Sequence, residues 1–259
     1  MAAAVEDRLI AQGLSILAGD RVLVQGLSLT VRRGEFLAIL GRNGSGKTLT
    51  LHALAGLTAA HSGRVLLDGE DMATLPRRRI ARLLGLLLQD REEALAGTAL
   101  ESALIGRHPH LRFWQREGAQ DLAIAQAALQ RFDLSWCAGR QLATLSGGEQ
   151  RRAAMASLLT QQPQIYLLDE PTNHLDPHHQ LQTLGVFRDL CREGASIIAT
   201  LHDPTLAERF ADRALLLCGD GDYRLGTTAE ILTAEALSAL YLMPISAIGA
   251  PPRRAFIAA

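Results

Sequence analysis

Apolar and polar positions along the first third of the chain predict a β-rich start followed by a strand, a loop and a helix. Over residues 8–30, apolar positions such as Val22, Val24, Leu27 and Leu29 are separated by polar breaks, which is typical of short strands in an antiparallel layer. A short apolar run over residues 36–40 then enters a glycine-rich turn, and residues 47–55 are compatible with a helix.

The middle of the chain changes from strand-like to helical patterning. Residues 64–67 and 85–88 read as strands on either side of a basic, helix-like stretch at 76–83. Residues 99–132 are rich in Ala, Leu and Gln and poor in β-branched residues, which favours helix. We therefore expect a helical lobe in this part of the chain.

The second half alternates between helical and strand patterns. Helices are predicted at 148–161 and 178–193, and strands at 165–168 and 196–201, an order that indicates a parallel sheet with helices on its faces. Residues 214–241 suggest one or two strands and two short helices. The last residues contain Pro244, Pro251 and Pro252 and are expected to form a surface appendage.

Composition narrows the class of protein. The chain has 259 residues, 48% hydrophobic and 20% charged, and its formal net charge of -1 gives no basic excess for nucleic acid. Its three cysteines have no zinc-type spacing, and a reducing cytosol is the simplest setting. No apolar run approaches the roughly 18–20 residues that span a bilayer. Charged residues at Glu6, Asp7 and Arg8 argue against an export signal.

A glycine-rich motif lies between the strand at 36–40 and the following helix. It has the pattern GxxxxGK[ST] and consists of Gly41, Arg42, Asn43, Gly44, Ser45, Gly46, Lys47 and Thr48. Its backbone amides can surround nucleotide phosphates, with Lys47 reaching the β- and γ-phosphates and Thr48 offering a hydroxyl to Mg²⁺. The flanking strand and helix disfavour a chance glycine-rich turn.

Two acids follow the apolar strand at 165–168. In a parallel sheet, Asp169 and Glu170 would lie at the same edge as the phosphate-binding loop. Asp169 could hold Mg²⁺ and Glu170 could polarise a water molecule that attacks the γ-phosphate. Such a pair alone would more often cap a helix, but the phosphate-binding loop favours the catalytic interpretation.

A third motif, LSGGE, precedes the helix predicted at 148–161. It consists of Leu145, Ser146, Gly147, Gly148 and Glu149. Alone it could be a helix cap that also offers amides to an anion. Together and in this order, the phosphate-binding loop, LSGGE and the acidic pair resemble the ATP-binding cassette (ABC) family.

The resemblance implies an α/β fold: a P-loop NTPase domain with a RecA-like core, an antiparallel β-subdomain and a helical subdomain. Residues 1–242 would form this domain, with the helical subdomain at about 92–160, and residues 243–259 a C-terminal tail. ATP and Mg²⁺ are the implied cofactors. Two copies would stack head to tail, so that LSGGE of one closes over the ATP of the other.

The same resemblance assigns roles to single residues. Glu170, His202 and Gln89 would be catalytic, with His202 touching the γ-phosphate and Gln89 sensing Mg²⁺ and water. Thr48, Gln89 and Asp169 would hold Mg²⁺, and Asp176 would lie in the turn that links the two sites. The family usually stacks an aromatic residue on adenine, and the matching position is Leu17. We therefore expect apolar contact with the base, and either weaker affinity for the base or looser selection between ATP and GTP.

The lack of a spanning segment favours an importer with a separate membrane permease. Residues 104–111, 173–180 and 201–213 resemble importers of ferric siderophores, haem and cobalamin. The implied partners are a second copy of the chain, permease subunits and, indirectly, a periplasmic or extracellular substrate-binding protein, at the cytoplasmic face of the inner membrane. Phe113 and Trp114 would either anchor the permease or close the core of the lobe.

Two rival functions remain. A soluble, non-transport ABC ATPase, for example in iron–sulfur cluster assembly, would carry the same motifs, and the resemblance at 106–111 argues against it. A small-molecule kinase has no use for LSGGE. The histidines at 174, 178 and 179 are interpreted as a solvated helix start and not as a metal site.

Overall fold

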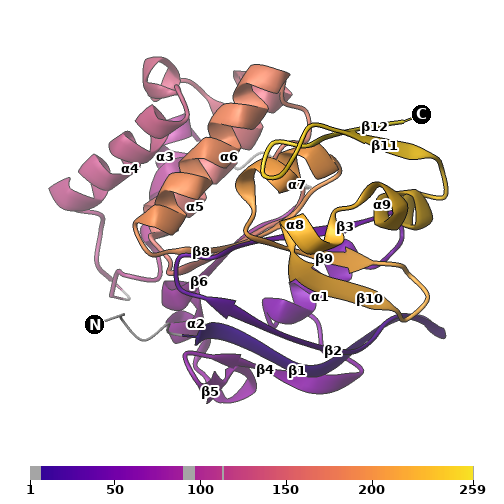
Figure 1. Cartoon of the computed structure of the whole chain (residues 1–259). Coiled ribbons are helices and arrows are strands. Elements are labelled where there is room, and N and C mark those ends of the chain that lie inside the picture. The colour runs from indigo at the N-terminus through magenta and orange to yellow at the C-terminus, as the bar shows by residue number, and fades with distance from the viewer. Residues whose placement is uncertain (1–6, 90–96, 113, 259) are drawn as a thin grey trace, which may run out of the picture.

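The computed structural model describes residues 7–89, 97–112 and 114–258 (Figure 1). Within these residues, no helix combines the length and the apolar character needed to cross a membrane. The chain forms an antiparallel sheet, a mixed but mainly parallel sheet, a helical lobe and a C-terminal hairpin.

The antiparallel sheet has the strand order β2-β1-β4-β5. It consists of β1 (Asp7–Ala18), β2 (Arg21–Arg32), β4 (Ser62–Leu67) and β5 (Glu70–Asp71). Where short strands were predicted, β1 and β2 each run for 12 residues. The polar and glycine breaks that looked like strand ends, around Gly13 and Gly26, are places where the pairing register shifts while the strands continue.

The second sheet has the order β10-β9-β3-β8-β7-β6. Its strands are β3 (Phe36–Gly41), β6 (Leu84–Leu87), β7 (Ile165–Leu168), β8 (Ser196–Thr200), β9 (Arg213–Leu217) and β10 (Tyr223–Thr227). All neighbouring pairs are parallel except β9 with β10. The carboxyl ends of β3, β6, β7 and β8 therefore meet at one edge, where the motifs lie.

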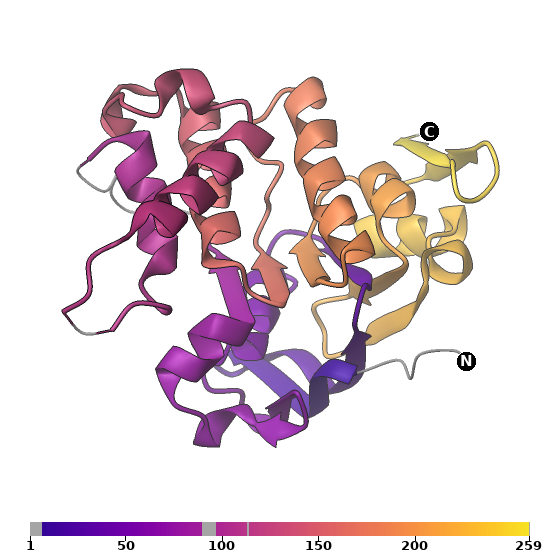
Figure 2. The same cartoon turned by 90° about the vertical axis from the view of Figure 1, so that its left-hand side faces the viewer.

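The two faces of this sheet pack against different layers. Alternation along β3 places Phe36, Ala38 and Leu40 in a core with the long helices, whereas Leu37 and Ile39 join a core with the antiparallel sheet. Helices α5 (Gly147–Gln161) and α6 (Pro177–Arg192) cover the first face, and α1 (Lys47–Leu54) lies between the two sheets (Figures 1 and 2).

The helical lobe is less regular than its sequence suggested. The stretch at 99–132 divides into α3 (Ala99–Leu104), a 3-10 turn (Ile105–Arg107) and α4 (Ala119–Arg131). At Gly106 the backbone approaches α5 so closely that a Cβ would lie 2.2 Å from the carbonyl oxygen of Ser157. This close packing ends α3 where composition alone predicts more helix.

The remaining helices are short. They are α2 (Arg77–Leu83), α7 (Pro204–Phe210), α8 (Thr228–Ile231) and α9 (Ala234–Tyr241), and further 3-10 turns lie at Met72–Thr74, Ser135–Cys137 and Leu142–Thr144. Helix α7 follows β8 directly, so its position depends on the same sheet edge that carries the motifs.

The C-terminal tail forms a docked hairpin of β11 (Ile245–Ile248) and β12 (Ala255–Ala258), which lies against α7 (Figure 1). Arg254 pairs with the buried carboxylate of Glu208 on α7, with Nε–Oε1 and Nη2–Oε2 distances of 2.9 and 3.0 Å. The backbone amide of Phe256 donates to Thr205 Oγ1 at 3.1 Å. The tail therefore packs on α7 through a buried ion pair and a hydrogen bond from a backbone amide.

Candidate active site

The phosphate-binding loop joins the buried strand β3 to α1. Gly46 caps α1 in the left-handed conformation, with φ of 97°. A Cβ at this position would lie 3.1 Å from Leu23 Cβ, so glycine satisfies both the backbone and the packing. The loop thus leaves its amide groups and the start of α1 facing one pocket.

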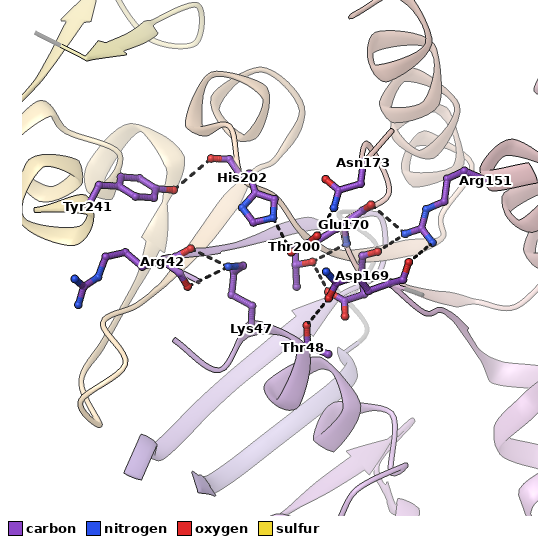
Figure 3. Close-up of polar contacts among 12 residues, drawn as sticks. Arg42, Lys47, Thr48, Arg151, Asp169, Glu170, Asn173, Thr200, His202 and Tyr241 are labelled. Atoms are coloured by element: carbon purple, nitrogen blue, oxygen red, sulfur yellow. Dashed lines mark hydrogen bonds and ion pairs between the residues drawn. The ribbon is translucent and has the colours of Figure 1, made fainter. Parts of the chain in front are cut away.

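Lys47 is the buried cation of this loop. Its Nζ donates to the carbonyl oxygens of Gly41 and Arg42 at 2.9 and 3.2 Å (Figure 3). Burial lowers the pKa of Lys47, and the charges of Glu170 and Asp169 act in the opposite direction. An anion in the pocket would further stabilise the charged ammonium group.

Glu170 is held in a strained and buried position at the end of β7. Its φ of 47° is unusual for a residue with a side chain, and the residue is only 6% exposed. Its carboxylate accepts a hydrogen bond from Asn173 Nδ2 and lies 2.6 Å from His202 Nε2. The backbone amide of Glu170 donates to Thr200 Oγ1 at 2.8 Å. The carboxylate is therefore fixed in orientation before any ligand binds.

Asp169 offers a buried oxygen that the protein itself does not satisfy. Its Oδ1 accepts a hydrogen bond from Thr200 Oγ1 at 2.6 Å, whereas Oδ2 has no hydrogen-bond partner among the described residues. Nearby, Thr48 Oγ1 lies 3.5 Å from Gln89 Oε1. These oxygen ligands, supplied from the ends of β7 and β6 and the start of α1, fit a hard cation such as Mg²⁺.

One pocket of about 570 Å³ gathers most of the predicted residues. It is lined by Ala18, Arg21, Leu23, Asn43, Gly44, Gly46, Lys47, Thr48, Leu49, Gln89, Glu170, Asn173 and His202. Leu17, predicted as the base-contacting residue, is not among the described residues that line it. Ala18 and Arg21 come instead from the facing ends of β1 and β2.

The LSGGE motif does not line this pocket. Ser146 caps α5 through a capping box in which its Oγ donates to Glu149 Oε2 at 2.8 Å and its backbone amide to the same oxygen at 2.7 Å. These bonds lower the pKa of Glu149. Asp176 similarly caps α6 and accepts from the His179 amide at 2.9 Å. The starts of α5 and α6 are thus capped by residues of their own first turns, and neither start lines the pocket.

Arg151 connects the helix that follows LSGGE to the ends of β6 and β7, a role that no sequence motif indicated. From the first turns of α5 its guanidinium donates to the carbonyl oxygens of Leu88, Gln89, Asp169 and Glu170. Figure 3 shows the contacts with Asp169 and Glu170. The sequence does show an arginine two residues after LSGGE, on a helix with many buried residues. Spacing alone could not identify which backbone it would bind.

A second hollow of about 380 Å³ lies beside the end of β6, between α2, the 3-10 turn Ile105–Arg107 and α5. Leu88, 42% exposed, and Ile105, 37% exposed, present apolar surface there. Trp114 is 90% exposed and so does not close the core of the lobe, whereas Phe113 lies outside the described residues. Among the residues described, no group of three His, Cys, Asp or Glu side chains could hold a metal ion.

Comparison with known proteins agrees with this geometry. Residues 24–173 match the family model described as ABC transporter. The hemin import ATP-binding protein HmuV of Pseudomonas aeruginosa is 40% identical over 235 residues, which cover 89% of this chain and 91% of that protein.

Solved structures lead to the same family. An inward-facing transporter assigned to the metal-chelate type has a TM-score of 0.84 at 26% identity and covers 98% of both chains. The dimeric bacterial ABC transporter cassette MJ0796 has a TM-score of 0.76 at 26% identity, covering 85% of this chain and 98% of its own. The predicted fold and family are confirmed: this chain belongs to the ABC transporter family, as a subunit that binds and hydrolyses ATP.

Proposed function

We propose that this chain is the ATPase subunit of an importer for haem or a related metal chelate, acting with a separate permease at the cytoplasmic face of the inner membrane. The observation that carries the proposal is 40% identity to a hemin import subunit over 89% of the chain. A soluble ABC ATPase of cluster assembly is disfavoured, because the similarity to a metal-chelate type transporter extends over 98% of the chain.

The pocket supports hydrolysis of ATP by its own residues. Lys47 and the loop amides bind the β- and γ-phosphates, while Asp169, Thr48 and Gln89 would hold Mg²⁺, which neutralises charge on the phosphates. Glu170, fixed by Asn173, orients and polarises the attacking water. His202 lies 2.6 Å from the same carboxylate, which supports a contact of its ring with the γ-phosphate in the proposed mechanism.

Two copies would complete each site. The start of α5 lies outside the pocket of its own chain, so Ser146, Gly147 and Gly148 would face the nucleotide of a partner. MJ0796, a relative of the same fold, is dimeric. ATP would then draw the two copies together, and hydrolysis would release them. Asp176, at the start of α6, would lie at the junction of the two sites.

The hollow beside β6 is the proposed contact with the permease. Its apolar rim includes Leu88, which directly precedes Gln89 in the nucleotide pocket. A permease helix seated there would therefore be coupled to the site through one peptide bond. A substrate-binding protein outside the cell would act only through the permease, and substrate identity would be set by those two partners.

The test is recovery of the transporter from membranes. A tagged chain is purified in mild detergent, with Ile105→Glu as a variant that puts a charge on the hollow and Arg253→Leu as a surface control. We expect a polytopic membrane protein to be recovered in equal amounts with the unmodified chain and with the Arg253→Leu control. With Ile105→Glu, recovery of that membrane protein should be lost. Haem, a ferric siderophore and cobalamin are then compared for stimulation of ATPase activity in reconstituted vesicles. Recovery of soluble partners only would overturn the transport proposal.

A further inference from the structure

We propose that Arg21 is the residue that binds the base of the nucleotide, by stacking its guanidinium plane on the purine ring. The proposal rests on the assignment of the pocket to ATP, and it replaces the expectation that apolar contact at Leu17 holds the base. Arg21 lies at the start of β2, opposite Ala18 at the end of β1.

The pocket has two chemically different ends. The loop amides, Lys47, Thr48, Gln89, Glu170 and His202 form the end that suits phosphates and Mg²⁺. The other end is formed by the antiparallel sheet, with Ala18 and Arg21 where β1 and β2 meet, and with Leu23, which also packs against Gly46 of the phosphate-binding loop. A nucleotide whose phosphates lie on the loop must place its ribose and base toward this second end. Of these three side chains, Arg21 has the planar group.

Strand geometry explains why Arg21 takes this place instead of Leu17. Neighbouring residues of a strand point to opposite faces of the sheet. Ala18 and Arg21 form one cross-strand pair, and Leu17 and Val22 form the next. Because Ala18 and Arg21 line the pocket, Leu17 and Val22 project from the other face. The small side chain of Ala18 leaves space for a ring beside the Arg21 guanidinium.

Arg21 is held in position before a nucleotide binds. Its Nη2 donates to the carbonyl oxygen of Gly219 at 2.7 Å. Gly219, with φ of 85°, lies against the phosphate-binding loop, since a Cβ there would be 3.1 Å from Ser45 Cα and 3.7 Å from Arg21 Nη2. The segment that contains Gly219 is also attached to β2, because the backbone amide of Gln25 donates to the carbonyl oxygen of Gly221 at 2.9 Å. The guanidinium is therefore oriented by the same segment that packs on the phosphate-binding loop.

Stacking on an oriented guanidinium has a consequence for selectivity. A guanidinium plane stacks on any aromatic face, and the interaction does not read the hydrogen-bonding edge of the ring. The lining residues at this end, Ala18 and Leu23, have no side-chain donor or acceptor either. ATP and GTP should therefore bind with similar affinity, and both should depend on Arg21.

The experiment compares nucleotide binding by Arg21→Ala, Arg21→Trp and the unmodified full chain, by calorimetry in EDTA so that hydrolysis does not occur. The ligands are ATP, GTP and inorganic tripolyphosphate, which carries the phosphates without a base. Arg64→Ala is the matched control, because Arg64 is an exposed arginine of the same sheet that does not line this pocket. Thermal melting establishes that each variant is folded.

Arg21→Ala is expected to lower the affinity for ATP and for GTP about tenfold, which corresponds to about 1.4 kcal/mol. The affinity for tripolyphosphate should not change. Arg21→Trp should restore ATP affinity, because an indole stacks on purines without supplying a positive charge. In steady-state assays the alanine variant should raise KM and leave kcat unchanged.

Three results would overturn the proposal: unchanged ATP affinity in Arg21→Ala, equal weakening of tripolyphosphate, which would make Arg21 a phosphate ligand, or failure of Arg21→Trp to restore binding. If the unmodified chain binds neither ATP nor tripolyphosphate, the assignment of the pocket itself is wrong, which is a different failure.

Discussion

Replacing Arg254 by leucine is expected to destabilise the domain, because it leaves a buried carboxylate without its cation. The side chains of Glu208 and Arg254 are 1% and 11% exposed, and two hydrogen bonds join them. Loss of one partner of such a pair costs about 3–5 kcal/mol. The hairpin can detach and let water reach Glu208, so its docking energy limits the loss, and we expect the lower value of about 3 kcal/mol.

For a domain of this size, each 1 kcal/mol shifts Tm by about 2–4 °C, so Arg254→Leu should lower Tm by about 6–12 °C. The assay is thermal unfolding followed by circular dichroism, with Arg253→Leu as the matched control because Arg253 is exposed. The double variant Glu208→Leu/Arg254→Leu should recover most of the loss, since no charge is then buried. A Tm within about 1 °C of the unmodified chain for Arg254→Leu, or a double variant as unstable as the single one, would refute this reasoning.

Three further changes test the site. Glu170→Gln should reduce the rate of phosphate release by about 10²–10⁴-fold, because the amide cannot polarise water. ATP affinity should stay within about threefold, because the phosphate-binding loop is intact. Undiminished turnover would refute the role of Glu170 in activating water. Arg151→Lys should lower the ATPase rate by about tenfold, since a single ammonium cannot reach the four carbonyl oxygens that the guanidinium binds, and normal rates would show that these bonds are dispensable. Hydrogen bonds hold the pKa of Glu149 below its ordinary value of 4.5, so its ionised form stabilises the fold above that pH and this contribution is lost as pH falls through the lowered pKa. Glu149→Gln keeps the capping box, so it should reduce the change in the free energy of unfolding, measured in urea, between about pH 6 and pH 3. An unchanged pH dependence in this variant would contradict the role of ionised Glu149 in stabilising the helix start.

The parallel strands of the six-stranded sheet could be predicted from the sequence, because each is a short, largely apolar run. Buried strands such as β3, β7 and β8 show this pattern directly. The lengths of β1 and β2 could not be predicted, because a glycine at a bulge looks the same as a glycine at a strand end. The C-terminal hairpin was also missed, since its docking depends on Arg254 meeting Glu208, 46 residues earlier in the chain.

The candidate site shows the same division between local and distant information. Lys47, Thr48 and Glu170 are identified by motifs that include their own strand and helix context, and the structure brings them to one pocket. Arg21 and Arg151 carry no such motif. The position of Arg21 depends on cross-strand pairing with Ala18, and that of Arg151 on the packing of α5 against the strand ends. Neither relation can be inferred from spacing along the chain.

The hydrogen bonds of Arg151 have a consequence for communication between two ATP molecules. In the head-to-tail dimer proposed above, the start of α5 would face the nucleotide of the partner, whereas Glu170 and Gln89 would face the nucleotide of their own chain. One guanidinium on α5 binds the backbone at both of those residues. A shift of α5 caused by the partner's nucleotide would therefore be transmitted to the backbone of Glu170, the proposed catalytic residue of its own chain. The two sites should accordingly hydrolyse ATP with positive cooperativity, and the Hill coefficient for ATP should fall toward one when Arg151 is replaced.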